Sequence, residues 1–304
     1  MIGKLDAVRR FLALFLLLPL SLAAPPSAAV CSAMGSASAQ TDNLTAAQAN
    51  ALVERALASE LRAAQDTSHP MRFRLHKVSP HLTSTKEIIE TRDGAVARLV
   101  ARFDRPLNAA DEQEEQARLD ALLADPSRQV HRKHGEDDDM NILLKLLRML
   151  PKAFVYQYAG VGVGPAGPVQ KFTFRPNRAF NPPDLETQAL TALTGQLWID
   201  AAQERVTRLE GHLQQDTDYG WGILGKLNKG GWVLLEQADV GGQQWRIARF
   251  QMVMDLRILF KNKSFDTLEE MTNYAPVSPG LDYKKAIEML RSGSGGVTTH
   301  SGAR

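Results

Sequence analysis

The clearest indication of the fold is GQLWID at residues 195–200, followed by RVTRLEG at residues 205–211. Leu197 and Ile199 stand two residues apart in the first run. In residues 206–213, Leu209 and Leu213 share one face, and Arg208, Glu210 and His212 share the other. A period of two is typical of β-strands that bury one face and expose the other. The stretch therefore predicts two short strands.

Short strands with turn residues between them extend on both sides of this stretch, over residues 154–260. Glycine pairs at 230–231 and 241–242 lead into further runs at 232–240 and 245–254, and we expect a last strand at 256–260. GVGVG at residues 160–164 indicates a hairpin loop, because a phosphate-binding loop would lead into a helix. Many strands without intervening helices predict a mainly β, α+β fold built on a curved antiparallel sheet or unclosed β-barrel.

The region that precedes these strands begins with a helix over residues 44–64, with Thr45 and Gln48 as a capping box. Alternating runs follow up to residue 103, with a turn at Asp93-Gly94. In the run 95–103 we expect a buried face and a solvated face. The predicted buried face holds Ala97, Leu99, Ala101 and Phe103, and the solvated face holds Arg98 and Arg102.

A helical insertion is expected at about residues 107–150. It comprises a solvated helix at 111–123, a charged connector, and an apolar helix at 140–150 that Pro151 stops. The acids at 136–139 would stand at the N-terminus of the second helix, where carboxylates meet the positive end of the dipole. An apolar helix of this kind must be covered, and we expect it to lie against one face of the sheet with the helix at 44–64.

The two ends of the chain are not expected to belong to the folded domain. Residues 1–39 combine a basic start, a short apolar run and the small residues Ala37-Ser38-Ala39, which predicts a signal peptide and a mature chain from Gln40. A retained anchor and an acylated Cys31 are the alternatives. Residues 40–291 are expected to form one domain, and residues 292–304 a disordered tail rich in glycine, serine and threonine.

The composition limits the classes of function. The chain has 36 basic and 34 acidic residues, of which three and one lie in the predicted leader, so the remainder is neutral and does not indicate nucleic-acid binding. Cleavage would also remove the single cysteine, and with it any thiol chemistry. The sequence has no nucleophile elbow and no HExxH motif, so we expect neither an enzyme nor a cofactor. His131 and His134 beside acids 136–139 could bind a metal, but a solvated connector is favoured and no metal is expected.

The WID strand and the RL-containing strand after it resemble a pattern of the lipoprotein-carrier superfamily, the LolA/LolB/RseB-like half-barrels. The resemblance covers less than about a tenth of the chain. It implies a hairpin within an unclosed barrel, and helices that cover a hydrophobic cavity for acyl chains. The chain differs from the simple carriers, because it is longer and its charged segment at 107–136 has no counterpart there. It is more similar to an exported branch of the superfamily.

These features predict a periplasmic protein that binds or carries a hydrophobic ligand, either a lipid or the acyl chain of an acylated protein, with transient membrane contact. The alternative is a periplasmic sensing or protein-interaction module that carries nothing. The cavity and its covering helix are expected to use Ile142, Leu143, Leu146, Leu147, Leu150, Trp198, Trp232 and Trp245. The tryptophans could instead fill an ordinary core, and the helix could be an ordinary core helix.

Overall fold

The computed structural model describes residues 44–164, 167–219, 225–258 and 261–293. The predicted signal peptide at 1–39, Cys31 and the start at Gln40 lie outside these residues, as does the tail from residue 294 onward. Within the described ranges, no helix is both long and apolar enough to span a membrane.

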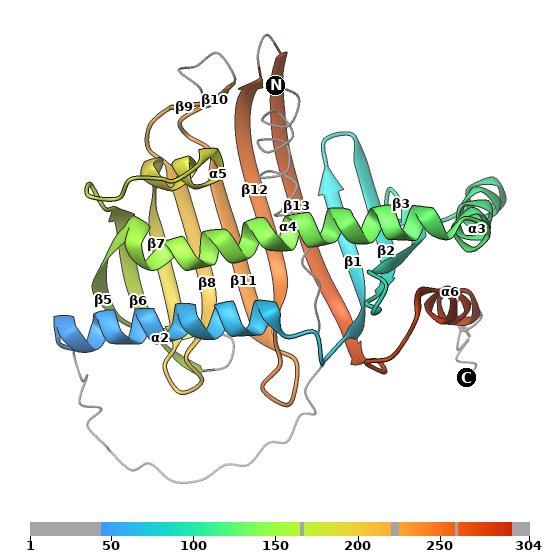
Figure 1. Ribbon diagram of the computed structural model, residues 1–304, viewed down its shortest axis with the longest axis horizontal. Coiled ribbons are helices and arrows are strands. Elements are labelled where there is room, and N and C mark those ends of the chain that lie inside the picture. The colour runs from blue at the N-terminus through green and yellow to red at the C-terminus, as the bar shows by residue number, and fades with distance from the viewer. Residues whose placement is uncertain (1–43, 165–166, 220–224, 259–260, 294–304) are drawn as a thin grey trace, which may run out of the picture.

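The described strands form one antiparallel sheet with the order β4-β3-β2-β1-β13-β12-β11-β8-β7-β6-β5, and β9 and β10 extend from β12 (Figure 1). The sheet is not closed, since β4 and β5 stand at its two ends. This arrangement confirms the predicted unclosed antiparallel barrel with helices. The strands are β1 Met71–Ser79, β2 Leu82–Ile89, β3 Val96–Arg102, β4 Arg105–Pro106, β5 Phe154–Gly164, β6 Gly167–Pro176, β7 Leu193–Asp200, β8 Arg205–Leu213, β9 Thr217–Tyr219, β10 Gly225–Leu227, β11 Trp232–Asp239, β12 Trp245–Ile258 and β13 Lys261–Pro276.

The prediction of a last strand at 256–260 was wrong, because β12 runs on to Ile258 and a further strand, β13, follows. β13 lies between β1 and β12, so it joins the strands that precede the helical insertion to those that follow it. Its sequence is largely polar, which hides a period of two. Thr267, Glu269 and Met271 are its buried alternate positions.

Helix α2 (Ala46–Gln65) has the predicted capping box, since the Thr45 and Gln48 side chains each bond the other residue's backbone. It is attached to the β7–β8 hairpin through Glu60. The carboxylate of Glu60 accepts hydrogen bonds from Arg205 Nε at 2.9 Å and from the Val206 amide at 2.8 Å. Asp200, at the end of the WID strand, accepts from the amides of Ala202 and Gln203 and so shapes the turn. Residues 195–211 therefore form a hairpin and also hold helix α2 in place.

Helix α4 (Pro126–Ala153) corrects the predicted connector and the predicted helix at 140–150. The charged run is helical and continuous with the apolar run, so the acids at 136–139 lie inside the helix and not at its N-terminus. Asp125 caps the N-terminus, and Pro126 occupies the first turn, where its missing N–H costs nothing. Pro151 lies in the last turn, whose carbonyls are satisfied by side chains. Tyr156 Oη donates to Leu150 O and Asn177 Nδ2 donates to Lys152 O.

Helix α3 (Ala109–Ala124) covers the edge of the sheet at β3, which β4 pairs only at Ala101 and Arg102. Side chains of α3 and α4 bond the remaining edge groups. Glu115 accepts from the Leu99 amide at 2.9 Å, and Arg118 donates to Ala97 O. At Ala95, Glu136 accepts from the amide and Arg132 donates to the carbonyl. The charged insertion thus satisfies backbone groups that an open edge would present to another chain.

The predicted faces of the run 95–103 were wrong. Arg98 is 4% exposed and its Nη2 lies 2.6 Å from Glu112 Oε1, whereas Phe103 is 61% exposed in the turn before β4. The reason is helix α6 (Tyr283–Ser292), which was not predicted from the sequence and which ends at the residue where the tail was expected to begin. It packs on the outer face of β2 and β3. Its apolar cluster includes Ile89, Val96, Leu119, Leu122, Tyr283, Ala286, Ile287 and Leu290.

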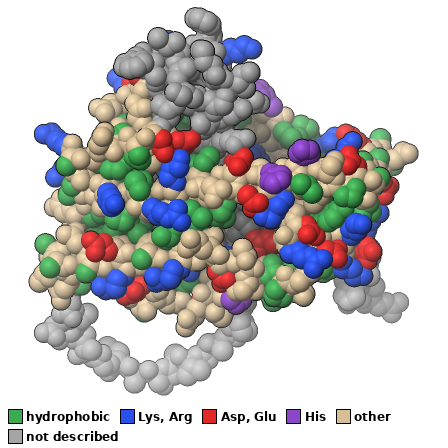
Figure 2. All heavy atoms as spheres, in the orientation of Figure 1, with side chains coloured by type: hydrophobic (Ala, Val, Ile, Leu, Met, Phe, Trp, Pro, Cys, Tyr) green, Lys and Arg blue, Asp and Glu red, His purple; other side chains and the backbone are tan. Residues whose placement is uncertain are grey.

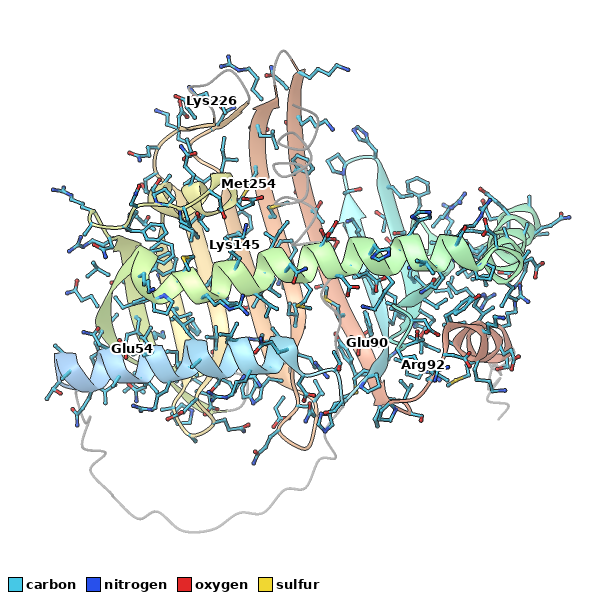
Figure 3. All side chains as sticks on the ribbon, in the orientation of Figure 1. Glu54, Glu90, Arg92, Lys145, Lys226 and Met254 are labelled. Carbon is cyan, nitrogen blue, oxygen red and sulfur yellow. The ribbon has the colours of Figure 1, made fainter. Side chains whose placement is uncertain are left out.

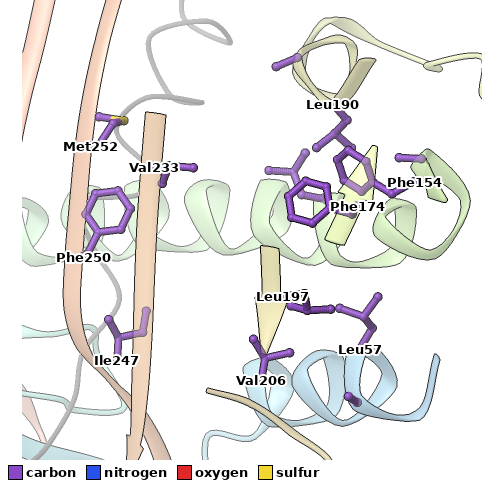
Figure 4. Close-up of a cluster of buried hydrophobic side chains, with 14 of the residues drawn as sticks. Leu57, Phe154, Phe174, Leu190, Leu197, Val206, Val233, Ile247, Phe250 and Met252 are labelled. Atoms are coloured by element: carbon purple, nitrogen blue, oxygen red, sulfur yellow. The ribbon is translucent and has the colours of Figure 1, made fainter. Parts of the chain in front are cut away.

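The main core lies on the inner face of the sheet, beneath α2, α4, α5 (Leu185–Gln188) and the 3-10 helix η2 (Ala189–Ala192). Figure 4 shows Phe154 and Phe174 beside Leu190, and Leu197 and Val206 beside Leu57 of α2. The rings of Phe154 and Phe174 lie 4.7 Å apart. The inner face under β5–β8 is therefore filled by side chains.

We expect Glu115→Ala to lower the free energy of unfolding by about 2 kcal/mol, because the Leu99 amide would lose its acceptor at a covered edge. Urea denaturation would measure this loss. The matched control is Glu114→Ala, whose side chain is 70% exposed and lies 3.5 Å from Arg102, and which should cost less than about 0.5 kcal/mol. Equal losses in the two variants would contradict the role of Glu115 in covering the edge.

Candidate functional site

The candidate site is the inner face of the central strands, over which α4 must cross. Near its N-terminus α4 is bonded to the β2–β3 turn, where Gln129 Nε2 donates to Asp93 O at 2.8 Å. At its C-terminus it leads directly into β5, at the opposite edge of the sheet. A helix fixed at these two places crosses the strands between them, as Figure 1 shows.

We call the apolar part of this inner face the trough. Its residues come from β1, β12 and β13, and they share a face because paired residues of neighbouring strands point the same way. Leu75 pairs with Met271, Phe250 with Glu269, Met252 with Thr267, and Met254 with Phe265. The trough residues are Leu75, Phe250, Met252, Met254, Phe265 and Met271. Methionine side chains adapt their shape easily, so a surface rich in them can accommodate different apolar partners.

The part of α4 that crosses this region is polar. Glu136 still bonds the β2–β3 turn, and from Ile142 onward α4 buries apolar side chains in the main core. Residues 137–141 between them are three aspartates, Met140 and Asn141. Figure 2 shows basic and acidic side chains interspersed on this side of the molecule. The helix therefore covers the trough with few apolar side chains of its own.

A buried ion pair interrupts the trough. Glu269 is fully buried, and Lys77 Nζ lies 2.8 Å from its Oε1. Among the described residues no donor reaches either carboxylate oxygen with hydrogen-bond geometry. Burial raises the pKa of Glu269, although Lys77 opposes that shift. Burying a charged pair costs several kcal/mol before its mutual attraction is counted, so this pair is a costly feature of the inner face.

Lys86 lies next to this pair on β2. It is paired with Leu75, and Ser84 two residues away is paired with Lys77, so Lys86 and Lys77 share the inner face. Burial lowers the pKa of Lys86, and the charges of Lys77, Arg118 and Arg132 lower it further. The inner face is thus apolar over β12, carries the acid Glu269 on β13, and is positively charged at β2.

The predicted covering residues lie together on α4. Ile142 and Leu146 are buried in the main core, and Leu143 and Leu150 pack against it. Leu147 is half-buried and lies outside both apolar clusters. Lys145, labelled in Figure 3, ties this half of α4 to the start of α5 through Asp184 at 2.8 Å and Glu186 at 3.6 Å. These residues cover the filled part of the inner face, while the trough lies beneath the preceding turns of α4.

The three predicted tryptophans are not brought together. Trp198 lies on the outer face, opposite to Leu197 and Ile199, with Lys171 Nζ at 4.3 Å from its ring centroid. Trp232 also lies on the outer face, because its neighbour Val233 is buried on the inner face, where it is paired with Met252. Trp245 is 4% exposed and donates from Nε1 to Gln203 Oε1 at 2.7 Å, which places it at the β7–β8 turn.

The residues of the predicted metal alternative belong to one helix. His131 and His134 lie on α4, and Glu136 is directed to the Ala95 amide. Over the described ranges, no three histidine, cysteine or acidic side chains converge as a metal site would require.

Sequence reasoning missed Lys77, Lys86 and Glu269 as site residues. Each occupies an inward position of a strand, where an apolar residue is expected. Lys77 continues the alternation of Phe73 and Leu75, so its inward direction could have been found from the sequence. Glu269 could not have been found without recognising β13 as a strand.

No protein-family model and no curated protein matches the sequence. Two solved structures are similar in fold. A Vibrio parahaemolyticus domain described as that of an outer membrane lipoprotein-sorting protein has 9% identity and a TM-score of 0.33, over 79% of this chain and 99% of that one. MucB in complex with MucA(peri) has 12% identity and a TM-score of 0.21, over 76% and 99%. Because both TM-scores lie below 0.5, neither likeness bears on what this chain binds.

A second acid, which is partly buried, lies away from the trough, where β1 begins. Glu90 Oε2 accepts a hydrogen bond from the Met71 amide at 2.8 Å (Figure 3). Burial raises the pKa of Glu90 to about 7, against the opposing charge of Arg246. Arg246 itself donates to His69 O at 2.7 Å, so these residues join the α2–β1 connection to β12.

We expect the stability of the protein to fall as pH rises from about 4.5 to 7 because of Glu90. In this interval folded Glu90 keeps a proton that the unfolded chain has lost, so the unfolded chain binds fewer protons and rising pH favours it. Glu90→Gln should remove this slope and raise stability at pH 8 by about 2 kcal/mol, with little change at pH 4.5. Urea denaturation across this pH range would measure it, with exposed Glu54→Gln as the control. Parallel curves for wild type and Glu90→Gln would contradict the prediction.

Proposed function

We propose that this protein binds an acyl chain of a lipid or of an acylated protein in the trough, in the periplasm, and that it acts by binding and not by catalysis. The observation that supports this is the mismatch between the two layers. The inner face of β1, β12 and β13 is apolar and rich in methionine, whereas residues 137–141 of α4 are mainly polar. Separating α4 from the sheet at this place costs little apolar contact.

An acyl chain is the ligand that such a surface binds best. Each buried methylene contributes about 0.8 kcal/mol, so a long chain binds without any specific polar contact. Displacement of the middle of α4 would expose the trough. Native mass spectrometry of the protein purified from its own host would detect a co-purified lipid. A homogeneous ligand-free protein that also fails to bind added fatty acid would refute the proposal.

A second candidate, a protein-interaction module, is favoured by the free edge of β5. Val161 is 45% exposed and Val163 is 83% exposed on this strand, and β6 is its only strand partner in the described sheet. A partner could add an extended segment here. Val161→Pro would remove an edge N–H and should weaken such a partner without changing fatty-acid binding, which a comparison of both affinities would reveal.

Leu146→Ala tests whether the apolar half of α4 belongs to a movable cover. In a fully packed core the substitution should cost about 2–5 kcal/mol. In a cover that a ligand displaces, the cost should be smaller, and a saturating long-chain fatty acid should restore the melting temperature by mass action. Leu147→Ala is the control, because its side chain lies outside the core and should cost less than about 1 kcal/mol. A large loss that no fatty acid restores would count against movement of this half of α4.

A further inference from the structure

The charged end of the trough contains one cation more than it has carboxylates to pair with. Lys77 has Glu269 at 2.8 Å, Arg118 has Glu115 at 2.7 Å, and Arg132 has Glu136 at 3.9 Å. Lys86 is the fourth cation of this group. Among the described residues, no carboxylate lies within 4.0 Å of its ammonium, so the group carries one unbalanced positive charge.

Lys86 would be unfavourable in this position if the protein had no use for its charge. It is partly buried and three cations face it, and Glu115 and Glu269 are the acids whose charges oppose theirs. Other cations of the inner edge bond backbone carbonyls, as Arg118 does at Ala97 and Arg132 at Ala95. Lys86 makes no such contact with a described residue. A structural lysine would be expected to gain a partner for the solvation it loses.

The place of Lys86 relative to the trough is set by strand register. Lys86 is paired with Leu75 on β1, and Leu75 is paired with Met271 on β13. Two strand spacings separate Lys86 from Met271, which is about 10 Å. The ammonium therefore stands at one end of an apolar surface that continues through Met271 and Phe250 toward Met252. A cation at the end of an apolar surface matches an amphiphile with a negative head group.

We infer that Lys86 binds the head group of an anionic amphiphile, a carboxylate or a phosphodiester, whose acyl chain lies along Leu75, Met271 and Phe250. This inference rests on the proposed function and specifies its ligand. One unbalanced positive charge fits a head group with one negative charge. Glu269 determines which way round the amphiphile binds. Its carboxylate lies farther along the inner face and repels an anion placed there, so the acyl chain occupies that part and the head group does not.

The experiment compares palmitate with its uncharged methyl ester, and phosphatidylglycerol with zwitterionic phosphatidylcholine. Binding is measured by displacement of a fluorescent fatty-acid probe and checked by native mass spectrometry. The variants are Lys86→Gln, which removes the charge, and Lys86→Arg, which keeps it. Lys171→Gln is the matched control, since Lys171 is a strand lysine on the outer face, where it stacks on Trp198.

For the wild type and Lys171→Gln we expect each anionic ligand to bind about tenfold more tightly than its uncharged or zwitterionic counterpart. Lys86→Gln should lose this preference while keeping its affinity for methyl palmitate, and Lys86→Arg should retain it. Removal of a partly buried cation that has no partner among the described residues should also leave the melting temperature of Lys86→Gln equal to or above that of the wild type. The larger of the two anionic preferences identifies carboxylate or phosphodiester as the head group.

Two results would overturn the inference. If wild type binds palmitate and its methyl ester equally, the proposed acyl-chain binding stands and the head-group assignment fails. If Lys86→Gln keeps the anionic preference, another cation holds the head group. Failure of every ligand to bind the wild type would instead refute the proposed function itself, together with the inference.

Discussion

Helix α4 is attached at both edges of the sheet, and this double attachment determines how the other elements are arranged. A helix of 28 residues is about 42 Å long. Nine strand spacings separate β3 from β5, which is about 43 Å at ~4.8 Å each. The helix is thus nearly as long as the sheet is wide. It acts as a strut that holds the two edges apart, and an antiparallel sheet that could otherwise curl further stays open.

The strut also explains the distribution of polarity along α4. Its first half must bond backbone groups at the β2–β3 turn, which requires side chains such as Arg132 and Glu136. Its last half must pack on the filled core, which requires Ile142 and Leu146. The change from charged to apolar resembles a helix boundary in the sequence, but it reflects two different attachments of one helix. The same division leaves residues 137–141 of α4, between the two attachments, mainly polar.

Sequence reasoning succeeded where local chemistry and periodicity agree. The Thr45 capping box, the alternation of β7 and β8, and the open antiparallel sheet followed from the residues and from the resemblance. It failed where tertiary contacts override local pattern. Arg98 is buried because α6 covers the outer face, and Glu269 is buried on a strand whose composition is that of a solvated segment. For the site, the residues of α4 were placed near the inner face, but Trp198 and Trp232 point away from it. A tryptophan's size indicates burial, whereas strand register decides its face.

The position of β13 has a consequence for how the chain reaches this structure. Met71 of β1 pairs with Pro276 of β13, about 200 residues later in the chain, and β13 also pairs with β12. The first three strands therefore cannot join the main sheet until nearly the whole domain has been synthesised. Pairing of β1 with β13 must close a very long loop, which makes it a late and slow step of folding. Until then the apolar inner faces of β1 and β13 stay exposed, and exposed apolar surface of this kind promotes aggregation.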